Sequence, residues 1–224
     1  MISKAVNPYY FAYRLQKKLS KDAIMILGNS CACTSLSQYG ISKKGQRLYT
    51  NVNCGTMGYD IPAALGAAIA SKKPVICATG DGSFQMNIQE LQTIVHNKLP
   101  VKFIIFNNNS YQAIAQTHQN FFNGVLTGCT PDTGVSFPSF KKIAFAYGMP
   151  YKKIKSHDNV DSGIDWLLST EGFCLCEILQ DTEQPIEPRI ISKKLSDGTM
   201  VSPPIDDLAP FLSKDDYRKY SKFT

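Results

Sequence analysis

The chain has 224 residues, enough for one large domain with a buried core, and 43% of them are hydrophobic and 19% charged, as in ordinary folded proteins. The formal net charge of +6 comes from scattered lysines without a basic stripe of interleaved aromatics, so we expect no nucleic-acid partner. No segment approaches the roughly 20 apolar residues of a membrane span, so we expect no membrane insertion.

The cysteines bear on metal binding and compartment. No two of them are spaced as CxxC, so neither a zinc site nor a redox pair is predicted for Cys31, Cys33, Cys54, Cys77, Cys129, Cys174 and Cys176. Cys174 and Cys176 alternate in a strand-like run, so both should face one side and pack in the core. The odd count and an opening without an apolar signal region favour a cytoplasmic location.

Helical periodicities and apolar runs alternate along the first 180 residues. Residues 8–19 predict a helix that begins near Pro8. Further helices are expected at 57–71, 83–97, 137–148 and 160–170. Strands are expected at 23–27, 74–79, 101–106 and 172–179. Because these strands are continuously apolar, we predict an α/β fold: a three-layer, doubly wound, mainly parallel sheet with helices on both faces.

The character of the sequence changes near residue 180. We expect one domain over 1–180, followed at 181–224 by a proline-rich, aperiodic stretch. This second part is predicted to be an irregular, extended C-terminal tail that lies on the surface of its own or another subunit.

Two polar motifs directly follow two of the predicted strands. Gly80-Asp81-Gly82 comes after the 74–79 strand and before the 83–97 helix, whereas Asn107 and Asn108 come after the 101–106 strand. Ligands of doubly wound sheets bind beyond the carboxyl ends of the strands. If the two strands are near neighbours, Asp81 and Asn108 converge on one spot.

The residue types at that spot favour a magnesium-bound diphosphate. Glycine lets the backbone approach a bulky anion, and free N–H groups at a helix start attract phosphate. Carboxylate and amide oxygens are hard ligands suited to Mg²⁺, which keeps phosphate oxygens in its shell. No GxxxxGK[ST] loop occurs, and Gln85 stands where GxGxxG needs its third glycine. For the triplet taken alone, a plain turn is an equally good interpretation.

Two motifs in the right order resemble those of thiamine diphosphate (ThDP) enzymes. The triplet, 24 residues and an Asn-Asn pair resemble their diphosphate motif. The segment GTMGYDIPAALGAA at 55–68 is similar to the part of acetohydroxyacid (acetolactate) synthases that carries the cofactor's aminopyrimidine. The stretch GDGSFQMNIQELQT is similar to the same family. The resemblance covers about residues 8–180 and matches only the C-terminal, diphosphate-binding domain of those enzymes.

The resemblance implies roles for individual residues. The side chains of Asp81 and Asn108 and the carbonyl of Ser110 would ligate Mg²⁺. The residues implied in ThDP binding are Asn29, Ser30, Gly55, Thr56, Met57, Gly80, Asp81, Gly82, Ser83, Asn108, Ser110 and Tyr111. Among them, Gly82 and Ser83 would donate N–H groups to the diphosphate, and Asn29 and Ser30 replace a Gln-His pair. The Gly55 carbonyl and Met57 N–H would hold the pyrimidine, with the Met57 side chain as the wedge that keeps the cofactor bent.

One functional part of the family has no counterpart in the chain. In the family, a glutamate that activates the cofactor comes from a separate N-terminal domain, usually on a neighbouring subunit. Glu90 lies inside the predicted 83–97 helix, where a structural role is expected. We therefore expect a partner chain or a missing N-terminal half to supply a pyrimidine-binding domain, within a homo- or hetero-oligomer.

Three residues after the metal loop bear on the substrate. Ile114 is aliphatic, as in the synthases, where pyruvate-decarboxylase-type enzymes have an acid. Thr117 stands where acetohydroxyacid synthases have a tryptophan, and this makes the predicted pocket more open and polar. His118 follows the loop and is either a substrate contact or a surface residue.

The resemblance implies a ThDP- and Mg²⁺-dependent enzyme, acetolactate synthase-like, acting on a small 2-oxo acid. It would decarboxylate that acid and transfer the carbanion equivalent to an acceptor carbonyl. Two alternatives stay open: a 2-oxo-acid decarboxylase subunit, and a non-catalytic remnant that binds ThDP or a partner.

Overall fold

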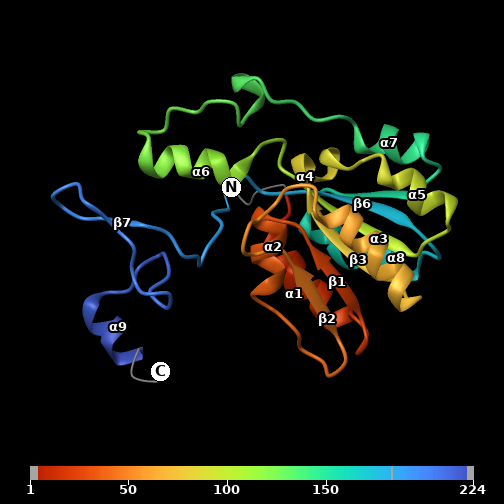
Figure 1. Cartoon of the computed structure of the whole chain (residues 1–224), viewed down its shortest axis with the longest axis horizontal. Coiled ribbons are helices and arrows are strands. Elements are labelled where there is room, and N and C mark those ends of the chain that lie inside the picture. Colours follow the sequence, from red (N-terminus) through yellow and green to blue (C-terminus); the bar gives the residue numbers. More distant parts are fainter. Residues whose placement is uncertain (1–4, 183, 221–224) are drawn as a thin grey trace. The chain divides into compact units, whose positions relative to one another are not determined.

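The computed structural model of the chain describes residues 5–182 and 184–220. It contains two compact units, Met1–Gln184 and Pro185–Thr224. The first unit holds a six-stranded sheet in the order β2-β1-β3-β4-β6-β5, with all its pairs parallel (Figure 1). Its strands are β1 (Ile24–Leu27), β2 (Arg47–Thr50), β3 (Val75–Gly80), β4 (Val101–Asn107), β5 (Tyr151–Ile154) and β6 (Cys174–Leu179).

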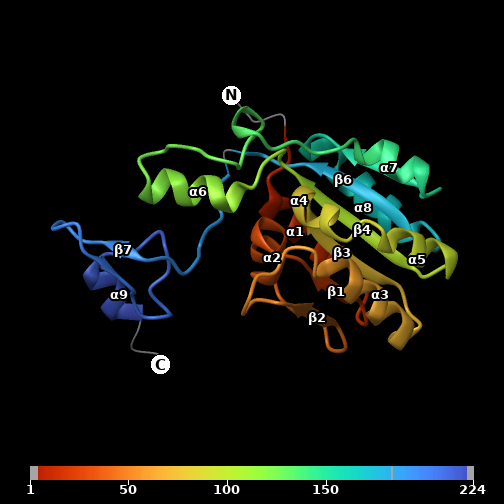
Figure 2. The ribbon, with the colours of Figure 1, turned by 45° about the horizontal axis from the view of Figure 1, so that its top comes forward.

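The predicted parallel α/β sheet is therefore confirmed, and the strands β3, β4 and β6 run side by side in Figure 2. The two strands that were not predicted, β2 and β5, are the two edges of the sheet. Edge strands are covered on fewer sides, and most residues of β2 and β5 are partly or fully exposed. They consequently lack the continuous apolar run by which the central strands were found.

Helices cover both faces of the sheet and form two separate cores. One core joins side chains of α1 (Pro8–Lys18), α2 (Ser30–Ser37) and α8 (Val160–Ser169) to one face. The other core joins α3 (Asp60–Ser71), α4 (Asp81–Met86), α5 (Glu90–His96) and α7 (Phe140–Ala146) to the opposite face. The remaining helical segments of this unit are α6 (Gln112–Phe121) and the 3-10 turns η1 (Pro131–Thr133) and η2 (His157–Asn159).

The side chains of the four central strands, β1, β3, β4 and β6, alternate between these two cores. In β6, Cys174 and Cys176 pack on the side of α1 and α8, and Leu175 packs on the other, all with no exposed surface. The prediction that both cysteines are core residues on one face is thus confirmed. Burial raises the pKa of Cys174 to about 11 and that of Cys176 to about 12, so both stay neutral thiols.

The prediction of one continuous helix over 83–97 is wrong. The structure has two short helices there, α4 and α5, separated at residues 87–89. Asn87 leaves the helical conformation, with φ −134° and ψ 37°, and its Nδ2 donates to the Gly58 carbonyl at 2.7 Å. The break therefore links the turn after β3 to the loop before α3.

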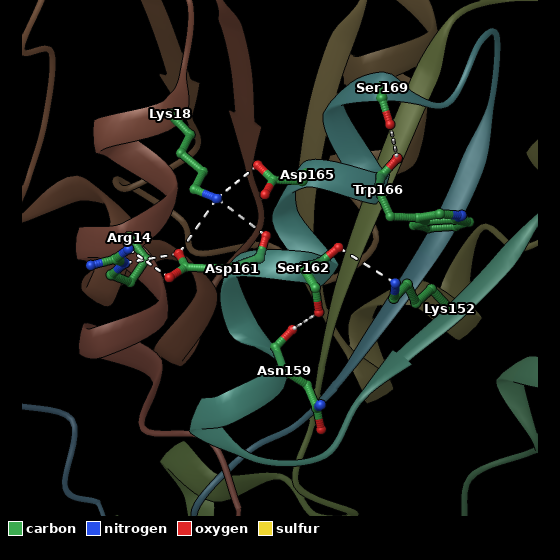
Figure 3. Close-up of polar contacts among 9 residues, drawn as sticks. All are labelled: Arg14, Lys18, Lys152, Asn159, Asp161, Ser162, Asp165, Trp166 and Ser169. Atoms are coloured by element: carbon green, nitrogen blue, oxygen red, sulfur yellow. Dashed lines mark hydrogen bonds and ion pairs between the residues drawn. The ribbon is translucent and has the colours of Figure 1, made fainter.

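Ion pairs connect α1 to α8 along their exposed sides. Figure 3 shows Arg14 facing Asp161, with 2.6 Å between the closest atoms, and Lys18 between Asp161 and Asp165. These side chains are substantially exposed, so solvent screens the pairs and they add little to stability. The packing of the two helices is set by the buried side chains beneath, which include Phe11, Leu15, Ile164 and Leu167.

Lys102 gives a first testable prediction. This residue of β4 is buried, and its Nζ donates to the carbonyls of Leu167, Leu168 and Thr170 at the end of α8. Replacing Lys102 with methionine leaves those carbonyls without their donor, so we expect a loss of about 1–2 kcal/mol in the free energy of unfolding, measured in urea. Lys152→Met is the control, because its Nζ only reaches the Ser162 carbonyl at the surface (Figure 3). Equal unfolding curves for the two variants would contradict the prediction.

The second unit has local structure of its own. A two-stranded antiparallel ladder joins β7 (Lys193–Lys194) to β8 (Met200–Val201), and α9 (Lys214–Tyr220) follows. Lys193 Nζ lies 4.5 Å from the centre of the Phe211 ring. The role of residues 181–224 as a surface tail stays a prediction.

Within residues 5–182 and 184–220, no helix is both long and apolar enough to cross a bilayer.

Candidate functional site

A cavity of about 130 Å³ lies where β1, β3 and β4 end. Parallel strands all point their carboxyl ends the same way. The residues that follow these three strands therefore meet at the carboxyl-terminal end of the sheet. The cavity is lined by eleven of the residues predicted from the sequence: Asn29, Ser30, Met57, Gly80, Asp81, Gly82, Ser83, Asn108, Ser110, Tyr111 and Ile114. The strands β3 and β4 are direct neighbours, which is the condition on which the convergence of Asp81 and Asn108 depended.

Asp81 organises the polar side of this cavity. Its Oδ1 accepts from the Gly82 N–H at 2.8 Å, and its Oδ2 accepts from the Asn109 N–H at 2.7 Å and the Asn108 N–H at 3.1 Å. Burial raises the pKa of Asp81 to about 6, and the backbone donors act in the opposite direction. The carboxylate thus connects the turn after β3 directly to the loop after β4.

The Asn108 side chain makes a local turn. Its Oδ1 accepts from both the N–H and the hydroxyl of Ser110 at 3.0 Å, and its Nδ2 donates to Gln112 Oε1 at 3.1 Å. A metal ion bound by Asn108 Oδ1 would replace the bonds to Ser110. Both predicted side-chain ligands therefore already line one cavity, with oxygen donors of the kind that Mg²⁺ takes.

Gly82 is needed at its position for steric reasons. A Cβ atom there would collide with the Tyr111 ring and lie 3.1 Å from Met57 Cε. The absence of a side chain lets Tyr111 and Met57 approach the backbone of the turn, where the first N–H groups of α4 begin.

Asp60 was missed by the sequence analysis, although it ties the predicted segments together. It has no exposed surface, and its Oδ2 accepts from Thr79 Oγ1 at 2.6 Å and Ser83 Oγ at 2.7 Å. The Ser83 hydroxyl accepts in turn from the Gly58 N–H at 2.8 Å. The sequence signal for this role was a single acidic residue at the start of a helix whose other residues are mostly small or apolar.

The charge of Asp60 gives a second prediction. Burial raises the pKa of Asp60 above the ordinary 3.8. The Asp60 carboxyl group therefore stays protonated to higher pH in the folded state than in the unfolded state. The resulting stabilisation is complete below the unfolded pKa and is lost as pH rises through the folded pKa. We expect Asp60→Asn to gain stability relative to the parent as pH rises from about 4 to about 8, in urea titrations. Parallel stability curves for the two proteins would contradict this.

Four predicted residues do not line the cavity. The Gly55 carbonyl accepts from Asn29 Nδ2 at 3.1 Å, and Thr56 Oγ1 accepts from Asn51 Nδ2. Thr117 Oγ1 donates to the Ala113 carbonyl within α6. His118 Nδ1 accepts from the Thr127 N–H at 3.3 Å, and its ring packs edge-on against Phe122.

Other lining residues had no signal in the sequence. They are Cys31, Ala32, Phe106, Gln112, Ala113 and Gln180. Most belong to α2 and α6, helices that were not predicted. Within the described part of the chain, no group of three His, Cys, Asp or Glu side chains is placed to hold a metal. The set predicted here has one carboxylate, with amide and carbonyl oxygens as the rest.

The fold and the residues at the carboxyl-terminal end of the sheet first define the class of protein. It is an α/β domain whose Gly-Asp-Gly turn and Asn-rich loop meet at one cavity. Residues 28–178 match the model of the thiamine pyrophosphate (thiamine diphosphate) enzyme C-terminal TPP binding domain, and the chain belongs to this family. The resemblance noted in the sequence is thereby confirmed.

The curated relatives include large subunits of acetolactate synthase. Acetolactate synthase 1, chloroplastic, of Nicotiana tabacum is 30% identical over 193 residues, which are 84% of this chain and 29% of the relative. The isozyme 2 large subunit of Escherichia coli (strain K12) is 31% identical over 155 residues, 69% of this chain and 28% of the relative. The acetolactate synthase large subunit of Porphyra purpurea is 35% identical over 141 residues, which are 62% of this chain and 24% of the relative. The match thus spans under a third of each relative.

Proposed function

We propose that the chain is the diphosphate-binding part of a ThDP- and Mg²⁺-dependent, acetolactate synthase-like enzyme. This enzyme would decarboxylate a 2-oxo acid and transfer the carbanion equivalent to an acceptor carbonyl. The observation that carries the proposal is the pair of bonds from the Asn108 and Asn109 N–H groups to Asp81 Oδ2, beside a cavity that Asn108 also lines.

The residues present fit the cofactor. Asp81, Asn108 Oδ1 and the Ser110 carbonyl would hold Mg²⁺, and the N–H groups of Gly82 and Ser83 would receive the diphosphate. Met57, held close to Gly82, would orient the cofactor from its apolar side. ThDP, when bound, supplies the carbanion chemistry, and the protein supplies binding, orientation and exclusion of water. The cavity of about 130 Å³ is smaller than complete ligand pockets, which have volumes of roughly 300–1,000 Å³. This difference supports the proposal that the cavity is one half of a site built between two domains.

A partner domain is part of the proposal. The chain spans under a third of the length of its relatives, and the activating glutamate is expected from a pyrimidine-binding domain on another chain or in a missing half. Glu90 begins α5 and is partly exposed, and it does not line the cavity. We therefore propose a homo- or hetero-oligomer in which the open cavity is completed by that domain.

Calorimetry tests the cofactor assignment. Mixed with an N-terminal half that carries the glutamate, the chain is expected to bind ThDP only when Mg²⁺ is present. Binding that is equal in EDTA and in Mg²⁺ would overturn the proposed metal. No binding to the mixture in either condition would favour a remnant that contacts only a partner.

Product analysis separates the two enzyme functions. Ile114 lines the cavity at the position where pyruvate-decarboxylase-type enzymes have an acid for proton transfer. An aliphatic side chain there supports transfer of the carbanion equivalent to an acceptor over its protonation and release as an aldehyde. A 2-oxo acid supplied with an acceptor should then give a 2-hydroxy ketone or acid. Free aldehyde as the product would instead establish a 2-oxo-acid decarboxylase subunit.

A cytoplasmic location is proposed from the thiols. All seven cysteines are free, and five are buried. Free buried thiols suit a reducing compartment. Cell fractionation with an antibody to the chain tests this, and recovery in an oxidising compartment would overturn it.

A further inference from the structure

A second polar cluster joins side chains of β4, β5 and β6, outside the cofactor cavity. Its centre is Glu177 of β6, which is 3% exposed. Glu177 Oε1 lies 2.8 Å from Lys153 Nζ and accepts from Asn107 Nδ2 at 2.7 Å, and Oε2 accepts from the Tyr151 hydroxyl. A buried carboxylate is tolerated only with such partners.

Asn107 is the link from this cluster to the predicted metal loop. It is the last residue of β4, and while its Nδ2 donates to Glu177, its Oδ1 accepts from the Asn109 N–H at 3.0 Å. An amide has one donor end and one acceptor end. Because a carboxylate can only accept, Glu177 determines that the oxygen of Asn107 faces Asn109. The rotated amide would place its NH₂ against the Asn109 N–H.

The Asn109 N–H is shared between two acceptors. It donates to Asn107 Oδ1 and, at 2.7 Å, to Asp81 Oδ2. Asn109 also has φ +56°, in the left-handed region that residues other than glycine seldom adopt. The two acceptors therefore hold a disfavoured backbone conformation between Asn108 and Ser110, the two other predicted metal ligands.

We propose that Glu177 is a positioning residue for the metal loop: by orienting the Asn107 amide, it holds the Asn109 N–H in place and with it the loop that presents Asn108 and Ser110. The loop geometry stands on the contacts above, and its consequence for Mg²⁺ rests on the proposed function. Lys153 and Tyr151 hold Glu177 in turn, and this explains how a charged residue is accommodated inside β6.

Amide hydrogen exchange of the free chain, followed by NMR, tests the loop geometry without any cofactor. In Glu177→Gln the amide at 177 can turn its donor toward Asn107, so the Asn109 N–H should exchange on the order of 10-fold faster. Amides of residues 103–105 in β4 should keep the parent's rates, which separates a local from a global effect. Lys152→Met, on the neighbouring strand and outside the cluster, is the matched control and should leave the Asn109 rate unchanged.

A double variant tests the direction of the bonds. Asn107→Asp combined with Glu177→Gln reverses donor and acceptor, since the new carboxylate accepts from the new amide and still offers an oxygen to Asn109. This pair should restore slow exchange at Asn109, although each single variant loses part of it. Unchanged exchange in Glu177→Gln, or no restoration in the pair, would overturn the inference.

The Mg²⁺ concentration that gives half-maximal ThDP binding is the second readout. Supporting residues around metal ligands are worth about 10- to 100-fold in metal affinity, and we expect a rise of about 10-fold for Glu177→Gln. If the parent binds no ThDP with Mg²⁺, the proposed function fails, and the exchange rates still decide the loop geometry. If exchange rises but the Mg²⁺ requirement does not, the consequence for the metal is overturned.

Discussion

Asp81→Asn is expected to weaken Mg²⁺-dependent ThDP binding by on the order of 100-fold or more, because it removes the single carboxylate of the predicted metal site. The substitution keeps one oxygen that can accept from the loop N–H groups, while its NH₂ then faces the Gly82 N–H, so the stability of the variant is measured alongside its binding. The measurement is calorimetric titration of ThDP at saturating Mg²⁺, with the pyrimidine-binding half present. A protein without the charge would have to hold the ion through neutral oxygens alone, and Mg²⁺ rarely gives up water for those.

The matched control for Asp81→Asn is Asp161→Asn. This carboxylate lies on α8, where it pairs with Arg14 at the surface, so its loss changes the net charge equally without touching the cavity (Figure 3). The control should bind ThDP as the parent does. If Asp81→Asn also binds as tightly as the parent, the metal site is assigned to the wrong residue. The fold of each variant is checked by its urea midpoint.

The central fold could be predicted from the sequence because its signals are short-range. The strands β3 and β4 are mostly apolar and are buried at every position but the last, since both faces of the sheet are covered by helices. The polar residues that follow these strands were therefore found together. The edge strands β2 and β5 carry no such run. The break between α4 and α5 was missed for another reason: Asn87 bonds to the Gly58 carbonyl, a contact between residues 29 apart in the chain.

The same distinction applies to the candidate site. Residues recognised by motif, such as Asp81 and Asn108, line the cavity. Asp60 and Glu177 lie behind those residues, and their importance comes from contacts with side chains on other elements, which no spacing in the sequence reveals. Thr117 and His118 show the converse. Thr117 was predicted to shape the substrate pocket, and His118 to be either a substrate contact or a surface residue. Neither lines the cavity: Thr117 bonds within α6, and His118 packs against Phe122.

Gly82→Ala is expected to lower the free energy of unfolding by about 2–3 kcal/mol and to weaken ThDP binding at least about 10-fold. The added methyl group meets the Tyr111 ring and Met57 Cε, so the turn must shift by moving residues that line the cavity. The displacement also moves the N–H groups predicted to receive the diphosphate. Urea unfolding and calorimetry on the same samples measure the two effects.

Gly66→Ala provides the opposite case on the same chain. Gly66 lies inside α3, where an added Cβ would meet no atom within 4 Å, so the methyl group should only reduce the freedom of the unfolded chain. We expect a gain of about 0.5–1 kcal/mol and unchanged ThDP binding. If Gly82→Ala is instead as stable as Gly66→Ala and binds as the parent does, Tyr111 can move aside at no cost. The close contact at Gly82 would then not shape the cavity.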